Sequence, residues 1–483
     1  MNSLDFQMLN YSALSPEIIL SVAGILLMLL IPFVKREKQA KLGYLSLVGI
    51  AAAMVAVIAQ WGQSDLTFFD MVFQDNFANF AKLLFLFAVA AIIATSIQYL
   101  ERDSLYKAEY FSLLLFATVG MCLMAASADL IMTFLGIEIL SIATYVLAGY
   151  RLGEQKSTES AVKYFLLGAF STGFLLYGIA FIYGATGSTK YLEIAQSLGN
   201  QTEYPVYLLI GLGLIFVGFG FKAALAPFHV WTPDVYEGAP IPITAHLAVA
   251  SKAAALIALL RILFQVVPSI SSGWVELLWI SAVLTMLVGN IAALTQSNIK
   301  RMLAYSSIAH AGYLLVGLAA NNDFGAQGVL FYLLAYAFMN LGAFAIIQII
   351  GRQNEETVEI KDYAGVGFQH PFLGLALSVF LVSLAGIPLT AGFTGKLFLF
   401  SAAVQSGMYW LVVIAVIASA IGIYYYLRVL IYMYMRDAEG EIKPVDRLSM
   451  ATRIVIVVMV LGTIYLGILP GSILKLASEA INF

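Results

Sequence analysis

Long apolar runs alternate with short polar connections along almost the whole chain. A helix that crosses the hydrocarbon core of a bilayer needs about 20 predominantly apolar residues. Runs of roughly this length predict fourteen transmembrane helices, at residues 16–34, 42–61, 77–98, 108–126, 129–150, 160–184, 205–226, 241–265, 274–295, 301–320, 328–351, 372–404, 409–435 and 453–470. The sequence therefore predicts an all-α polytopic membrane protein. The connection at 185–204 contains YLEIAQSL, an amphipathic segment expected to lie along the membrane surface.

The composition agrees with a membrane protein and excludes several kinds of site. The chain has 483 residues, of which 61% are hydrophobic and only 11% charged, whereas soluble domains carry about 25% charged residues. A net charge of -3 provides no basic field for nucleic acid. The single cysteine, Cys122, excludes an internal disulfide and an iron–sulfur cluster held by several thiolates. We therefore expect no cofactor or metal ion bound by this chain.

The basic residues predict an orientation in the membrane. Connections after even-numbered helices hold almost only Lys190, with Arg261 at a helix end. Connections after odd-numbered helices hold Lys35, Arg36, Lys38, Lys41, Arg102, Lys107, Arg151, Lys156, Lys300, Arg301, Arg352, Lys361, Arg436, Lys443 and Arg447. Because lysine and arginine accumulate on the cytoplasmic side, the odd connections are predicted to be cytoplasmic and both termini to lie outside.

Two of the predicted helices are interrupted, and each contains a lysine. In helix seven, Lys222 is followed by Pro227, and apolar character continues beyond it. Helix twelve is too long for one span and contains Gly386, Pro388 and Lys396. A snorkelling side chain is the alternative for Lys222. Paired interruptions in corresponding segments are a sequence indicator of a transporter site.

The two interrupted helices lie five helices apart, which reverses their direction across the membrane. We therefore predict two inverted five-helix repeats, helices 4–8 and 9–13. The corresponding regions are 1–107 for helices 1–3, 108–265 for the first repeat, 266–435 for the second repeat, and 436–483 for helix fourteen and the tail.

Further ionisable residues fall at membrane depth. Glu138 and Lys252 lie in the middle of helices five and eight, where neither side chain reaches an interface easily. Lys163 and His310 also fall in spans, although snorkelling and helix packing respectively would explain them. Ionisable residues inside a membrane indicate function by default. A carboxylate near a lysine favours its protonated form, so moving either partner changes its affinity for a proton. The set predicts proton transfer, and the scarcity of other acidic groups argues against a sodium site.

Three segments carry a specific resemblance. They are KAALAPFHVWTPDVYEGAPIP around Lys222, ESAVKYFLLGAFSTGFLLYG around Lys163, and QSNIKRMLAYSSIAHAGYLL around His310. With them the chain resembles, over essentially its whole length, the antiporter-like membrane subunits of bacterial NADH-quinone oxidoreductase (respiratory complex I). Subunit M of that family carries a glutamate in the helix-twelve position and subunit L has a C-terminal extension. Lys396 and the end at Phe483 therefore favour the third antiporter-like type.

The resemblance implies roles for particular residues. Glu138 and Lys222 would form the pair of the cytoplasmic half, Lys252 would be the central relay, and Lys396 would be the group on the outward side. Lys163 and His310 are further candidates on the path. FMN, iron–sulfur clusters, NADH and quinone would be bound by other subunits of a hetero-oligomer in the bacterial inner membrane. Subunit M, small subunits K and J, and lipid would be the neighbours.

Other functions remain compatible with the same residues. The family also contains large subunits of multi-subunit cation/proton antiporters, and a hydrogenase-type membrane arm would have the same fold, so fold alone does not settle the function. A purely structural subunit is a third possibility, but it would gain nothing from charges buried in the membrane.

Overall fold

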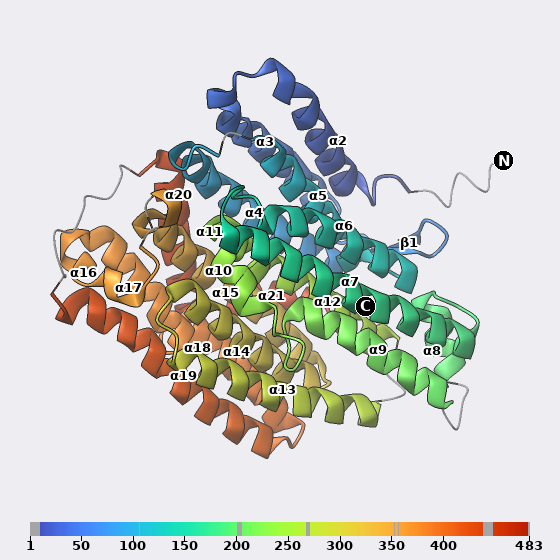
Figure 1. The fold of residues 1–483 in the computed structure, drawn as a ribbon. Helices are drawn as coiled ribbons and strands as arrows, with labels where there is room; N and C mark the ends of the chain where they lie inside the picture. The colour runs from blue at the N-terminus through green and yellow to red at the C-terminus, as the bar shows by residue number, and fades with distance from the viewer. Residues whose placement is uncertain are drawn as a thin grey trace.

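The computed structural model describes residues 10–105, 107–199, 205–266, 271–351, 353–355, 357–437 and 448–481. The part described is a bundle of long helices (Figure 1). Its first half contains α2 Ser15–Leu30, α3 Leu42–Ala59, α4 Asn76–Arg102, α5 Glu109–Ala126, α6 Leu130–Ala148, α7 Gln155–Thr186, α8 Tyr191–Gly199, α9 Val206–Ala223, α10 Thr232–Gly238, α11 Ile241–His246 and α12 Lys252–Gln265. A π-helical turn, η3 (Leu247–Ser251), joins α11 to α12.

The second half continues in the same way. It contains α13 Ser271–Leu294, α14 Ile299–Ala319, α15 Asp323–Ile350, α16 Val366–Gln369, α17 Pro371–Ala385, α18 Ala391–Gln405, α19 Tyr409–Met435, α20 Met450–Ile468 and α21 Gly471–Ala480. Short 3₁₀ turns lie at Ile31–Phe33, Arg36–Lys41, Gln353–Glu355 and Ile360–Tyr363. Side chains of Asp75, Asp129, Asn298, Asn322 and Ser449 cap helix N-termini, as short polar side chains commonly do.

The predicted spans are confirmed. Within the described residues thirteen helical segments are long and apolar enough to cross a membrane. The remaining predicted span, 372–404, is divided between α17 and α18, each of which is short. The protein is thus a multi-pass membrane protein. Its grouping into two inverted repeats and the boundaries of the four regions stay predictions.

Both interruptions occur where proline and glycine predicted them. Helix α9 ends at Ala224, which adopts a left-handed conformation (φ 58°), and Pro227 follows in a cis peptide bond. Helix α17 ends at Gly386 with φ 85°, which glycine adopts readily. A β-carbon at Gly386 would lie 2.9 Å from the Lys396 amine, so the glycine also leaves room for that amine.

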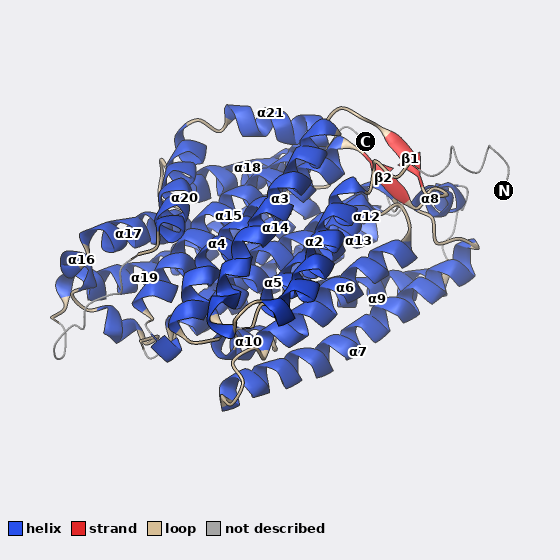
Figure 2. Ribbon diagram, turned by 90° about the horizontal axis from the view of Figure 1, so that it is seen from above, coloured by secondary structure: helices blue, strands red, loops and turns tan. Residues whose placement is uncertain are grey.

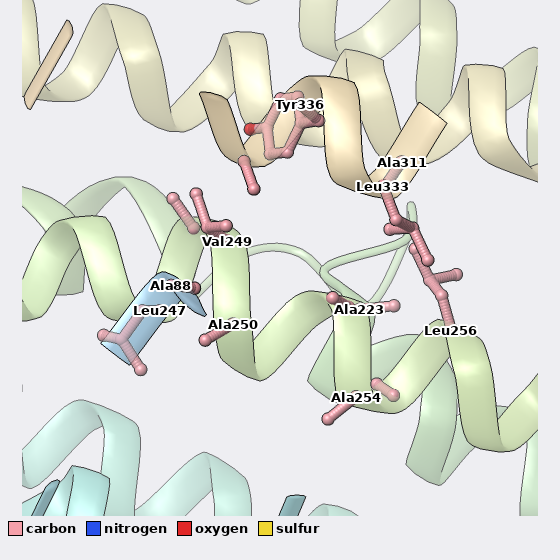
Figure 3. Packing of buried hydrophobic residues seen from close by; sticks show 14 of the residues in the cluster. Ala88, Ala223, Leu247, Val249, Ala250, Ala254, Leu256, Ala311, Leu333 and Tyr336 are labelled. Atoms are coloured by element: carbon pink, nitrogen blue, oxygen red, sulfur yellow. The ribbon is translucent and has the colours of Figure 1, made fainter. Parts of the chain in front are cut away.

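The helices differ in how much of their surface is buried inside the protein. Helices α11–α12, α14 and α15 lie almost wholly inside the protein, whereas α2, α3, α7, α19 and α20 are mostly exposed and form its periphery. Small side chains let the central helices approach closely. In Figure 3, Leu247 lies against Ala88 of α4, and Leu256 lies toward Ala311 of α14 and Leu333 of α15. The inner helices carry two of the predicted site residues, Lys252 on α12 and His310 on α14.

Several features differ from the prediction or add to it. A small antiparallel hairpin, β1 (Asp65–Thr67) and β2 (Val72–Gln74), was not predicted. It lies at the same end of the bundle as α8, the predicted amphipathic segment (Figure 2). The final helix α21 was also missed. Lys300 and Arg301, predicted in the connection after helix nine, belong to the first turn of α14, because Asn298 caps that helix. Arg352, Lys443 and Arg447 lie outside the described residues.

Candidate functional site

Lys222 is buried at the end of α9, with 4% of its surface exposed. Its Nζ donates to the hydroxyls of Ser141 at 2.9 Å and Tyr164 at 3.0 Å. The amine also lies 5.3 Å from the centre of the Tyr164 ring and 5.9 Å from that of Tyr145, a distance at which a ring face attracts a cation. The amine is thus held by neutral oxygens and aromatic faces rather than by a carboxylate.

Glu138 lies one turn before Ser141 on α6, so the two side chains share a helix face. It is half-buried, and its Oε1 has no hydrogen-bond partner among the described residues. No ion pair within 4.0 Å joins Glu138 to Lys222, so the two groups of the predicted pair are separated in this structure, and the Lys222 amine binds Ser141 instead.

Lys252 is the first residue of α12 and is 2% exposed. Its amine donates to the carbonyl of Ser307 at 2.6 Å and to the hydroxyl of the same residue at 2.7 Å. The sequence placed this lysine at mid-span but could not identify its partner, which lies 55 residues away on α14.

His310 continues the polar stripe of α14 from Ser307. Its Nδ1 lies 2.6 Å from the hydroxyl of Tyr332, and its Nε2 lies 3.0 Å from that of Tyr426, which also contacts Ser306. Both ring nitrogens are therefore engaged, and one of them must accept if the imidazole is neutral. His310 thus connects α14 with α15 and α19 through hydrogen bonds, which fits the helix-packing role considered from sequence.

Lys396 lies on α18, just after the second interruption, and is 6% exposed. Its amine donates to the hydroxyl of Ser419 at 2.8 Å and to the carbonyls of Leu384 and Ala385 at 3.2 and 3.3 Å. These carbonyls belong to the last turn of α17, where helical partners are lacking. The amine also lies 4.8 Å from the centre of the Tyr313 ring. The break in helix twelve thus provides the ligands that hold this charge.

Side chains with hydroxyl or imidazole groups lie between the lysines. Tyr164, which holds Lys222, lies within reach of Ser251, the neighbour of Lys252. On α14, Ser307, His310 and Tyr313 occur at helical spacing and lead from Lys252 toward Lys396. Such groups both donate and accept hydrogen bonds and can relay protons, with water filling the gaps.

Lys163 differs from the other candidates because its side chain is 39% exposed. Its amine lies 2.5 Å from Glu159 and 2.6 Å from Asp234 on α10. Arg301 contacts the other oxygen of Asp234 at 2.7 Å. The snorkelling alternative describes this lysine well. The charged cluster lies beside the interrupted helix seven, at the end of the bundle where α10 is found.

Sequence reasoning missed four buried ion pairs, which involve three carboxylates. Glu355 accepts from Lys300 at 2.6 Å and from Tyr99 at 2.7 Å, and lies 3.5 Å from Arg151. Arg261 binds Asp75 through two contacts of 2.7 and 2.8 Å, and Lys82 lies 2.7 Å from Glu17. Glu355 follows a predicted helix end, where nothing in its local sequence distinguishes it from a solvent-exposed loop residue. Asp75 lies two residues before the predicted helix 77–98, a position that indicates only a helix cap.

The chain is similar to known membrane proteins over most of its length. Residues 127–422 match the family model described as NADH:quinone oxidoreductase/Mrp antiporter, TM. NADH-quinone oxidoreductase subunit N of Trichlorobacter lovleyi is 50% identical over 99% of this chain and 98% of its own length. A chain in the structure of respiratory complex I from Thermus thermophilus with bound aureothin superposes with a TM-score of 0.82 at 35% identity, covering 96% of this chain and 99% of that one.

A second solved structure is also similar. A chain of the membrane-bound sulfane sulfur reductase, an archaeal respiratory membrane complex, superposes with a TM-score of 0.84 at 26% identity, covering 97% of this chain and 96% of that one. The chain belongs to the NADH:quinone oxidoreductase/Mrp antiporter family of membrane subunits. Within that family, its full-length relatives at 39–50% identity are N subunits of NADH-quinone oxidoreductases, and it groups with them.

Proposed function

We infer that this chain is the proton-translocating, antiporter-like subunit N of an NADH-quinone oxidoreductase. The observation that carries the inference is the line of buried ionisable groups, Lys222, Lys252, His310 and Lys396, each held by neutral oxygens or hydroxyls inside the bundle. Full-length similarity to subunits of that name supports the choice of complex. Buried amines are costly to place in a membrane, and their presence there therefore indicates a function.

Proton transfer would proceed along this line. Protons enter from the cytoplasm toward Lys222, past the cluster of Lys163 and Asp234 or past His229, a half-buried residue between α9 and α10. Movement of Glu138 toward or away from Lys222 changes the affinity of that lysine for a proton, because an adjacent carboxylate stabilises the charged amine. Lys252 and His310 then pass the proton laterally, and Lys396 releases it outward.

The redox chemistry would take place elsewhere in the complex. NADH oxidation through FMN and iron–sulfur clusters, and reduction of quinone, are assigned to other subunits of a hetero-oligomer. Subunit M and the small subunits K and J are the proposed neighbours, with lipid around the exposed helices. We place the complex in the bacterial inner membrane, with both termini on the periplasmic side, from the lysine and arginine bias.

Replacement of Lys222 or Glu138 by alanine tests the proposal. In the assembled complex, both variants are expected to pump fewer protons for each NADH oxidised, because the amine that accepts the proton or the carboxylate that modulates it is absent. The measurement is proton uptake by membrane vesicles together with NADH oxidation. Normal proton pumping in both variants would contradict the proposed role.

A milder change tests Lys396. A Lys396→Glu variant keeps a titratable group beside Ser419, so it is expected to retain part of the proton pumping, whereas Lys396→Leu is expected to lose it. Equal pumping by the glutamate and leucine variants would show that a titratable side chain is not what this position requires.

A second candidate function rests on the structural similarity to the sulfane sulfur reductase. An antiporter or hydrogenase-type membrane arm would use the same residues with other partners. Purification of the chain from its own membranes distinguishes them. Co-isolation with NADH-oxidising flavin and iron–sulfur subunits supports the complex proposed here, and isolation with only other antiporter subunits contradicts it.

A further inference from the structure

His246 is a buried histidine to which the proposed pathway assigns no role. It is the last residue of α11 and has no measurable exposure. Neither of its ring nitrogens has a hydrogen-bond partner among the described residues. An unsatisfied buried polar group costs about 1–3 kcal/mol. Since an apolar side chain would fill the same space without this cost, the histidine requires an explanation such as a bound water or a role in the chemistry.

His246 lies in the part of the fold that holds the first two groups of the proposed pathway, Lys222 and Lys252. Helix α9, which carries Lys222 in its last turn, packs against α12, the helix that continues from His246 through the π-helical turn. A π-helical turn, Leu247–Ser251, follows His246 directly and ends one residue before Lys252. Turns of this kind are frequent at functional sites.

The π-helical turn also sets the direction of the side chains. Hydrogen bonds in such a turn join residues five apart, so His246 and Ser251 lie closer to the same side of the helix than they would in an α-helix. In an ordinary α-helix, with 3.6 residues per turn, residues five apart would point to different sides. Ser251 in turn lies within reach of Tyr164, which holds the Lys222 amine. The Ser251 hydroxyl therefore lies on the side of the helix near Tyr164, and the π-helical turn brings the His246 imidazole closer to that side than an α-helix would.

We propose that His246 is a proton-carrying residue that works through bound water between Lys222 and Lys252. The inference rests on the proposed function. A neutral imidazole accepts a proton at one nitrogen while the other donates. In this scheme the proton leaves the Lys222 amine, crosses water to His246, and continues by way of Ser251 to Lys252, with no bond formed or broken other than those to the proton.

His246→Phe and His246→Gln variants test the proposal in the assembled complex. Phenylalanine fills the space, and glutamine keeps the ability to hydrogen-bond water, but neither takes up a proton. A positioned group that transfers a proton contributes about 10²–10⁴-fold to a rate. Both variants are therefore expected to slow proton transfer through this subunit by about a hundredfold and to lower the protons pumped for each NADH oxidised. Assembly is checked by the yield of intact complex.

His370→Phe is the matched control. His370 precedes α17 and has a buried Nε2 without a partner among the described residues, but it contacts none of the four buried ionisable groups of the proposed pathway. Proton pumping is expected to be unchanged in this variant.

The possible results separate the two proposals. Normal pumping in both His246 variants, or recovery in the glutamine variant alone, overturns the role of His246, because hydrogen bonding or packing would then suffice. If the phenylalanine variant fails to assemble, proton pumping by the glutamine variant alone tests the role of His246. If Lys222→Ala in the same vesicles pumps normally, the proposed function itself fails.

Discussion

A Lys252→Met variant is expected to stop nearly all proton transfer through this subunit. Methionine fills the space of the lysine stem but offers no titratable group between Lys222 and His310, and it leaves the Ser307 hydroxyl and carbonyl without their donor. A charge at the centre of a bilayer costs about 2.5–3.5 kcal/mol, which corresponds to roughly a hundredfold slower passage. Proton uptake by vesicles during NADH oxidation measures the effect.

A lysine on the surface provides the control. Lys475 on α21 is 79% exposed at its side chain and lies 4.0 Å from Glu479. The Lys475→Met variant removes the same chemical group and is expected to pump normally. Full pumping by the Lys252 variant, or an equal loss in both variants, would remove Lys252 from the pathway.

A Glu355→Ala variant is expected to lower the stability of the protein by about 3–5 kcal/mol, the range for breaking a buried ion pair by removal of one partner. The carboxylate is 5% exposed at its side chain and is the contact of the nearly inaccessible Lys300 amine. It also accepts from the backbone N–H of Ile241, at the start of the helix that leads to Lys252. Its loss therefore leaves Lys300 charged and uncompensated and loosens the end of that helix.

The loss is measured by thermal unfolding of the purified protein. The fraction of the variant that remains in the assembled complex is measured as well. Glu159→Ala is the matched control, because Glu159 pairs with Lys163 at the surface, where both side chains are partly exposed. Exposed pairs contribute about 0–1 kcal/mol, so this variant is expected to unfold near the wild-type temperature. Equal stability of the two variants would contradict the structural role given to Glu355.

The buried carboxyl of Glu355 also predicts that the stability of the folded protein depends on pH. Burial raises the pKa of Glu355, but Lys300 and Arg151 lower it further, so that it lies below the ordinary value of 4.5. A carboxyl with a depressed pKa stabilises the folded protein above its unfolded pKa, and the contribution is lost as the pH falls through the folded pKa. Glu355→Gln is therefore expected to weaken the acid-induced loss of stability between about pH 4.5 and the lower folded value. An unchanged pH profile would contradict this.

Much of the fold follows from local features of the sequence. The length of each apolar run is set by the thickness of the bilayer, so the spans were predicted to within a few residues. Pro227 and Gly386 end helices for reasons contained in the residues themselves, namely a missing N–H and tolerance of positive φ. Lys222, Lys252 and Lys396 were recognisable as candidates because a charge at membrane depth is unusual in any apolar run.

The partners of these amines were decided only by the tertiary structure. Ser307 meets Lys252 across 55 residues and Tyr426 meets His310 across 116, through helix packing that no local pattern encodes. The same holds for Glu355, which is a loop residue in the sequence and a buried ion-pair partner in the fold. Apolar length and helix-breaking residues act within one segment, and they alone determined the helices and their interruptions. Which polar side chains share the interior depends on how the helices pack, and therefore only the folded chain shows it.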